Sequence, residues 1–172
     1  MTTATEITDA TVREVTEWLF AEAELLDTGK YRGWLDLVAE DLSYVVPLRV
    51  TREREAETDI VEGMTLMDDD WDSMEMRVLR LETEYAWAED PPSRSRHFVT
   101  NIRVAAGEAE GEVAVKSNLL LYRTRGDVAT FDILSGERHD VLRRVAGGYR
   151  LAKRVVVLDQ TTVMTHNLAL IM

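Results

Sequence analysis

Residues 96–125, RHFVTNIRVAAGEAEGEVAVKSNLLLYRTR, decide the fold of this 172-residue chain. Two segments rich in Val, Ile, Leu, Tyr and Phe flank a break that begins at Gly107, and such segments favour β-strands. The pattern continues to residue 161, with further breaks at Gly126-Asp127 and Gly147-Gly148. These turns lie about 20 residues apart, so the strands exceed the usual length of roughly 5–6 residues and must twist and bend. The second half of the chain therefore predicts a curved, mainly antiparallel meander.

The residues before Pro91-Pro92 show helical spacing instead. Two apolar stripes recur at helical intervals of three, four or seven residues, with Val12, Val15, Leu19 and Leu26 in one and Met74, Val78, Leu81 and Tyr85 in the other. Residues 42–50 form the strand expected in this half, with Pro47 at a sheet edge or a bulge. The charged residues 51–63 are expected to be an exposed excursion.

Helices followed by a meander predict an α+β fold in which N-terminal helices cover the concave face of a cone-shaped sheet. We expect one domain over residues 1–172, with a helical half at 1–92 that contains one strand and a β-meander at 93–172. The mouth of such a cone can hold a ligand or be filled by side chains.

Charge divides the chain at the same boundary. The sequence has 32 acidic and 20 basic residues, for a net charge of −12; residues 1–90 carry −16 and residues 91–172 carry +4. We therefore expect acidic helices to pack on basic strands, with the surplus negative charge facing solvent. The acidic balance argues against binding to a nucleic-acid backbone.

The chain contains no cysteine, which excludes disulfides, thiolate metal ligands and cysteine nucleophiles. No apolar run approaches the ~20 residues of a membrane span, and the N-terminal residues lack the basic-then-apolar order of a signal peptide. These features predict a cytoplasmic protein that does not associate with membranes.

Acid–base chemistry has one candidate set in the sequence. His97 opens a predicted strand and can face the cone mouth, where Asp36 or Asp41 would join it from the helical side, with Tyr44 nearby. Such groups suit proton abstraction beside a carbonyl, so one alternative is a stand-alone dehydratase or isomerase. A ligand-binding cone without catalysis is the other alternative.

Residues 78–101, VLRLETEYAWAEDPPSRSRHFVTN, resemble the small (β) subunits of Rieske non-haem iron aromatic-ring-hydroxylating dioxygenases of the naphthalene, biphenyl and benzene type. The matching stretch in that family reads R-L-x-T-x-x-A-W-A-E-x-P-x-S-R-x-R-H. Agreement extends to residues 22–49, 116–126 and 148–168, in the same order. The resemblance implies an NTF2-like (cystatin-like) cone.

It also implies a structural role with no cofactor and no catalytic residue on this chain. The partner would be an α subunit that carries a Rieske [2Fe–2S] cluster and a mononuclear Fe(II), in an α3β3 hexamer with β–β contacts. A ferredoxin and a reductase would supply electrons to the α subunit, which inserts O2 into an aromatic hydrocarbon to give a cis-dihydrodiol.

Subunit contacts are expected within the motif and near the end of the sequence, because aromatic and arginine side chains are enriched at the centres of protein interfaces. The residues expected to form them are Trp87, Asp90, Arg94, Arg96, His97, Asp159 and Asn167.

Overall fold

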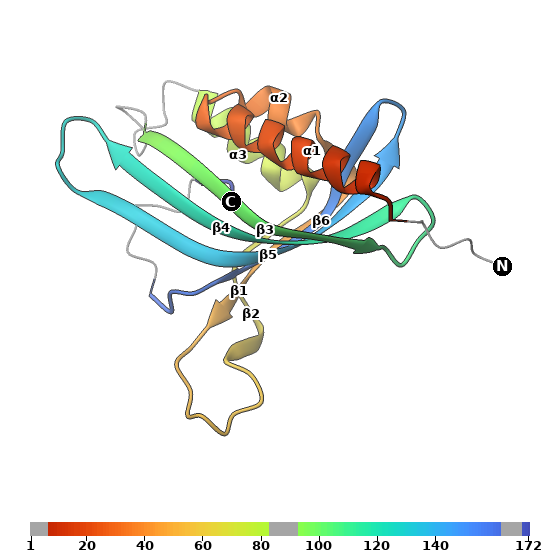
Figure 1. The fold of residues 1–172 in the computed structure, drawn as a ribbon. Helices are drawn as coiled ribbons and strands as arrows, with labels where there is room; N and C mark the ends of the chain where they lie inside the picture. Colours follow the sequence, from red (N-terminus) through yellow and green to blue (C-terminus); the bar gives the residue numbers. More distant parts are fainter. Residues whose placement is uncertain (1–6, 83–92, 163–169) are drawn as a thin grey trace.

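The long strands predicted after Pro92 form one curved sheet, and the helices lie over one of its faces (Figure 1). The computed structural model describes residues 7–82, 93–162 and 170–172. The elements within these ranges are α1 (Asp9–Asp27), α2 (Tyr31–Leu35), β1 (Val38–Arg49), β2 (Ile60–Asp69), α3 (Trp71–Glu82), β3 (Ser93–Ala106), β4 (Glu112–Arg125), β5 (Phe131–Val145) and β6 (Gly148–Leu158).

The sheet has the strand order β2-β1-β6-β5-β4-β3. Strands β3 to β6 pair antiparallel in sequence order, which confirms the predicted meander. β1 joins β6 in parallel, and β2 pairs antiparallel with β1 as an edge strand. The predicted α+β class is therefore confirmed.

The first half of the chain contains two strands, where the sequence predicts one. The expected excursion at residues 51–63 ends early, because β2 begins at Ile60. β2 pairs on one side only and is largely exposed. Because neither of its faces is fully buried, its sequence does not show the alternation of apolar and polar residues that predicts a strand. Pro47 lies in β1 beyond Val45, the last residue that pairs with β6, and the pairing with β2 shifts on both sides of it. Its position thus combines the expected irregularity with pairing on one side only.

Helix α1 holds the helical layer against the sheet. The Oγ1 atom of Thr8 accepts a hydrogen bond of 3.2 Å from the Thr11 backbone and caps the helix. Val15 and Leu19 on its inner side are fully buried, and the indole of Trp18 donates to the carbonyl of Tyr149 on β6 at 3.0 Å. These contacts fix α1 above the concave face of the sheet.

Ion pairs join the acidic half to the basic half, as the charge division predicts. Two arginines on β5 form these pairs. Nη1 of Arg144 lies 2.7 Å from Oε2 of Glu14 on α1, and Nη1 of Arg143 lies 2.8 Å from Oδ1 of Asp41 on β1. These pairs are exposed, so each contributes little stability by itself.

The β1–β2 hairpin, with its loop at residues 51–59, projects away from the sheet on the side opposite the helices (Figure 1). The loop carries four acidic and two basic side chains, and nearly all of its residues are exposed. Its charge and exposure correspond to the excursion expected from the sequence, although it is shorter than expected.

Candidate functional site

His97 lies buried on β3, beneath the end of α1. Its Nδ1 atom is 2.6 Å from Oδ1 of Asp27, and its Nε2 atom is 2.9 Å from the carbonyl oxygen of Ile171. The main-chain N–H of His97 donates to the same Asp27 carboxylate at 3.0 Å. Both ring contacts are to acceptors, so both are satisfied when each ring nitrogen carries a hydrogen. His97 thus links α1, β3 and the last residues of the sequence.

The acid–base set expected in the cone mouth is wrong. Asp36 is exposed, and the carboxylate of Asp41 accepts hydrogen bonds from Arg143 at the surface. The carboxylate that faces His97 belongs instead to Asp27, which lies 70 residues earlier in the chain. The alternative dehydratase or isomerase therefore loses the geometry on which it depended.

Among the described residues, four charged side chains that the sequence analysis did not single out lie together in the interior of the cone. They are Glu22 on α1, Arg138 and Asp140 on β5, and Arg154 on β6, and none is more than 2% exposed. We call them the interior cluster. Its two carboxylates and two guanidinium groups balance in formal charge.

Arg154 is the centre of the interior cluster. Its Nε and Nη2 atoms each donate to Asp140 at 2.8 Å, and its Nη1 and Nη2 atoms donate to Glu22 at 2.8 and 2.9 Å. The indole of Trp34 donates to Glu22 at 3.1 Å. Planar forked pairing of this kind fixes both partners, so the interior cluster ties α1 to β5 and β6.

Arg138 is held more loosely. Its Nη1 atom is 3.5 Å from Glu22, and its Nε atom donates to Ser117 at 3.4 Å. Its Nη2 atom is buried and has no hydrogen-bond partner among the residues that the structure describes. Burial lowers the pKa of Arg138, and the nearby Arg154 guanidinium acts in the same direction.

The protonation states of the cluster are set by its pairing. Burial acts to raise the pKa of Glu22, but the guanidinium groups of Arg154 and Arg138 bring it below its ordinary value. For Arg154, burial acts to lower the pKa, but the Asp140 and Glu22 carboxylates raise it well above the ordinary value. Burial raises the pKa of Tyr44 to about 12. At neutral pH Glu22 is therefore ionised with both oxygens occupied and Tyr44 is neutral, an arrangement suited to holding elements together and not to general-base chemistry.

His97, one of the residues expected at subunit contacts, is buried within the chain, and the other six fall into three groups. Arg94 and Arg96 are exposed and occupy alternate positions of β3. Nη1 of Arg96 lies 3.6 Å from Oδ2 of Asp27. Asp159 follows β6 and accepts a hydrogen bond from the hydroxyl of Ser135 on β5, so the structure does not bring it together with the β3 residues. Trp87, Asp90 and Asn167 lie outside the described residues.

Beside Arg94 and Arg96, the face of the sheet that points away from the helices carries exposed apolar side chains. We call them the outer patch: Phe98, Leu120, Tyr122, Phe131 and Ile133, which are 36% to 56% exposed. In register, Phe98 pairs with Leu120 and Tyr122 pairs with Ile133, so the patch is continuous across β3, β4 and β5.

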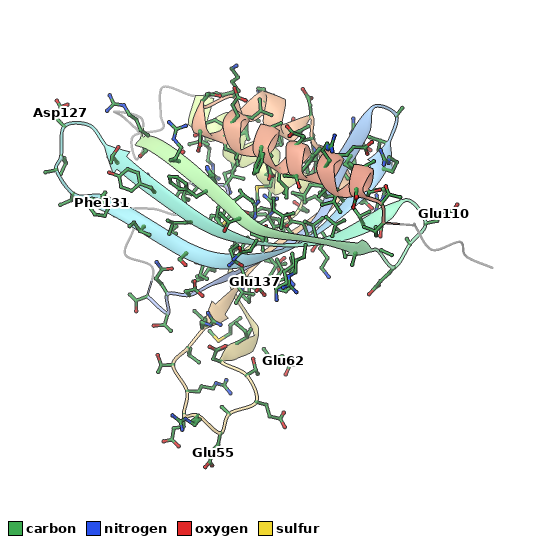
Figure 2. All side chains as sticks on the ribbon, in the orientation of Figure 1. Glu55, Glu62, Glu110, Asp127, Phe131 and Glu137 are labelled. Carbon is green, nitrogen blue, oxygen red and sulfur yellow. The ribbon has the colours of Figure 1, made fainter. Side chains whose placement is uncertain are left out.

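Ring contacts extend the outer patch toward the β4–β5 turn. The rings of Tyr122 and Phe131 lie 5.3 Å apart between centroids. Figure 2 shows Phe131 at the far end of the sheet beside this turn, where Asp127 is labelled, well away from the helices. Soluble monomers rarely expose large contiguous apolar patches, which mark interaction sites.

The described residues show neither a metal-binding cluster nor a membrane-spanning helix. Within residues 7–82, 93–162 and 170–172, His, Asp and Glu side chains form no group of three that could hold a metal ion. None of the helices described there is long and apolar enough to cross a membrane.

Known proteins resemble this chain in sequence and in structure. The sequence profile of the family described as "Ring hydroxylating beta subunit" matches residues 21–165. The β subunit of biphenyl 2,3-dioxygenase from Rhodococcus jostii (strain RHA1) is 36% identical over 91% of this chain and 86% of that protein. The β subunit of benzene 1,2-dioxygenase from Pseudomonas putida (strain F1 and other designations of that strain) is 35% identical over the same shares. A solved structure of naphthalene 1,2-dioxygenase with indole in its active site superposes with a TM-score of 0.84 at 26% identity, covering 98% of this chain and 90% of that chain.

Proposed function

We propose a role that follows from the family to which this chain belongs, the ring-hydroxylating β subunits: it is the non-catalytic subunit of a ring-hydroxylating dioxygenase. Membership in the family implies an α-subunit partner. On this proposal the α subunit carries the Rieske [2Fe–2S] cluster and the mononuclear Fe(II), and it converts an aromatic hydrocarbon to a cis-dihydrodiol. The complex is a cytoplasmic α3β3 hexamer with β–β contacts, and a ferredoxin and a reductase reduce its α subunits.

The outer patch is the observation that carries this proposal. Its aromatic side chains are exposed in the isolated chain, and the arginines Arg94 and Arg96 lie at its border on β3. Aromatic residues and arginine are the types enriched at interface centres. We assign this face, together with the motif residues Trp87 and Asp90, to the contact with the α subunit, and we assign Asp159 and Asn167 to a second contact. His97 supports this contact only from beneath the surface, because its ring is buried against Asp27 and Ile171.

The interior of the cone supports a scaffold role. In the described residues it is filled by the interior cluster and by Trp34, Tyr44 and Met172, which are all fully buried. Since one sheet takes strands from both halves of the chain, residues 1–172 are proposed to act as a single domain.

The test compares this chain alone with this chain produced together with its α-subunit partner. The isolated chain should contain no iron, should be colourless and should not turn over biphenyl or benzene, the substrates named for its relatives. The co-purified complex should contain iron, show the visible absorbance of a Rieske cluster and turn over an arene when reduced. Turnover by the isolated chain, or full activity of the α subunit in its absence, contradicts the proposal.

A further inference from the structure

The last three residues of the sequence lie inside the cone. Leu170 is 8% exposed, Ile171 is 3% exposed and Met172 is fully buried. All three belong to the main apolar core. We call residues 170–172 the terminal segment.

Main-chain atoms of the terminal segment bind three buried side chains. The N–H of Met172 donates to the hydroxyl of Tyr44 at 2.8 Å, and that hydroxyl donates to the Met172 carbonyl oxygen at 2.7 Å. Nη1 of Arg154 donates to the same carbonyl oxygen at 3.0 Å, and Nε2 of His97 lies 2.9 Å from the Ile171 carbonyl oxygen. Tyr44 on β1 and Arg154 on β6 are register partners on adjacent strands, whereas His97 reaches the terminal segment from β3 at one edge of the sheet.

The receptor groups are held in place by partners outside the terminal segment. Arg154 is fixed by its paired bonds to Asp140 and Glu22, and His97 is fixed by Asp27. A site whose donors are already oriented binds at a lower entropic cost than one that must be ordered. The site is therefore built by the body of the protein, and the terminal segment occupies it.

The recognised groups are main-chain groups, and the side chains that accompany them are apolar. The interior cluster is balanced in formal charge, so the site offers no excess charge to a charged side chain. If the terminal segment moved out of the site, the hydroxyl of Tyr44 and Nε2 of His97 would lose the carbonyl oxygens of Met172 and Ile171 as acceptors. Buried donors without acceptors are unfavourable, so the site favours an occupied state.

We propose that the interior of the cone is a peptide-binding site, which takes a short apolar peptide through main-chain hydrogen bonds, and that residues 170–172 are its resident ligand. The site is distinct from the outer patch, and the proposal does not depend on the role assigned to the chain above.

Digestion by carboxypeptidase tests the proposal on a recombinant chain of all 172 residues, with release of Met172 and Ile171 followed by mass spectrometry. The wild-type chain should resist digestion compared with a free peptide of the same terminal sequence. Tyr44→Phe removes the hydroxyl that binds Met172 twice, and digestion should accelerate about tenfold, as expected when one net hydrogen bond is lost from a local opening equilibrium. Tyr122→Phe alters an exposed tyrosine of the outer patch and is the matched control, expected to digest like the wild type. Rapid digestion of the wild type, or equal rates in both variants, overturns the proposal.

A second experiment supplies the ligand in trans. A chain that ends at residue 169 should melt at a lower temperature, and the acetylated peptide Leu-Ile-Met should raise that melting temperature in a concentration-dependent way. The same peptide should leave the full chain unchanged, because its site is occupied. An equal effect on both chains, or no effect on a folded shortened chain, contradicts the proposal. Digestion of the full chain decides the question if the shortened chain does not fold.

Discussion

Asp140 on β5 and Arg154 on β6 are cross-strand neighbours whose side chains form two parallel hydrogen bonds of 2.8 Å inside the cone. Glu22 of α1 occupies the remaining side of the same guanidinium group. Through Glu22, Arg154 joins the acidic helical half to the basic meander at a fully buried point. Buried polar contacts therefore connect the helices to the sheet in addition to the apolar core.

Removing Arg154 should be far more costly than removing an exposed arginine. Arg154→Met leaves two buried carboxylates without their main partner, and we expect the free energy of unfolding to fall by about 3–5 kcal/mol. Arg143→Met removes an exposed guanidinium group from Asp41 and Glu112 and should cost about 1 kcal/mol or less. Denaturant unfolding of both variants measures the difference. Similar losses would show that the interior cluster contributes no more than a surface pair.

Acid should weaken the fold through Glu22. Burial acts to raise its pKa, but Arg154 and Arg138 bring it below the ordinary value of 4.5. A carboxyl group whose pKa is lower in the folded state contributes stability above its unfolded pKa and loses that contribution as the pH falls through its folded pKa. The free energy of unfolding should therefore decline as the pH is lowered below about 4.5.

The matching variants are Glu22→Gln and Glu24→Gln, the second on the exposed side of the same helix. Glu22→Gln should flatten the dependence of unfolding free energy on pH in the acid range, and Glu24→Gln should leave it close to the wild type. Equal slopes in the two variants would place the acid sensitivity elsewhere.

Association with the α subunit should depend on the outer patch. Phe98→Asp places a charge in the part of the patch that lies on β3, and we expect binding to the α subunit to weaken by at least about tenfold, since burial of an unpaired charge opposes association. Phe20 on α1 is 49% exposed, the same as Phe98, so Phe20→Asp is a matched control that should bind normally. Quantitative pull-down of the α subunit compares them, and unimpaired binding by Phe98→Asp contradicts the assignment.

The arginines at the border of the patch provide a second measurement. Arg94→Glu and Arg96→Glu reverse exposed charges on β3 and should reduce the fraction of chain recovered in the complex. Arg150→Glu, an exposed position on β6, is a suitable control. Normal assembly of both β3 variants would remove these arginines from the interface.

His97 should matter for folding and not for the chemistry of the complex. His97→Ala removes the ring that binds Asp27 and Ile171, and we expect a loss of roughly 1.5–3 kcal/mol in unfolding free energy. His139→Ala, at an exposed residue paired with Glu137, should cost much less. Turnover per mole of iron in the assembled complex should be unchanged by either variant. A lower turnover per iron in a fully assembled His97→Ala complex would assign it a catalytic role.

Several features of the fold follow from local patterns in the sequence. The alternation of apolar residues and the paired glycines at 147 and 148 predict the meander, and the stripe at Val15, Leu19 and Leu26 predicts α1. These features depend on residues close together in the chain, where periodicity is informative. Val12 of the predicted stripe is 37% exposed, so the buried side of α1 is rotated slightly from the expected one.

The positions of the interior-cluster residues in the sequence indicate that they are buried, although a search for apolar residues alone does not find them. Glu22 lies three residues after Leu19 and four before Leu26, on the buried stripe of α1. Asp140 and Arg154 occupy inward positions of their strands, two residues from the buried Leu142 and Val156. Charged residues at inward positions indicate buried pairing, but the sequence does not say which partners meet. The sequence does not indicate the contact between Asp27 and His97 for the same reason, because the two residues lie 70 positions apart. Asp36 and Asp41 are the residues expected there instead, because the helical side of the chain is predicted to supply a carboxylate at the cone mouth.

The stoichiometry of the complex tests the central claim most directly. Native mass spectrometry of this chain purified together with its α subunit should show three copies of each, with iron in proportion to the α subunit. A chain that remains a stable monomer in the presence of the α subunit, with no iron-containing complex formed, would contradict its role as a β subunit.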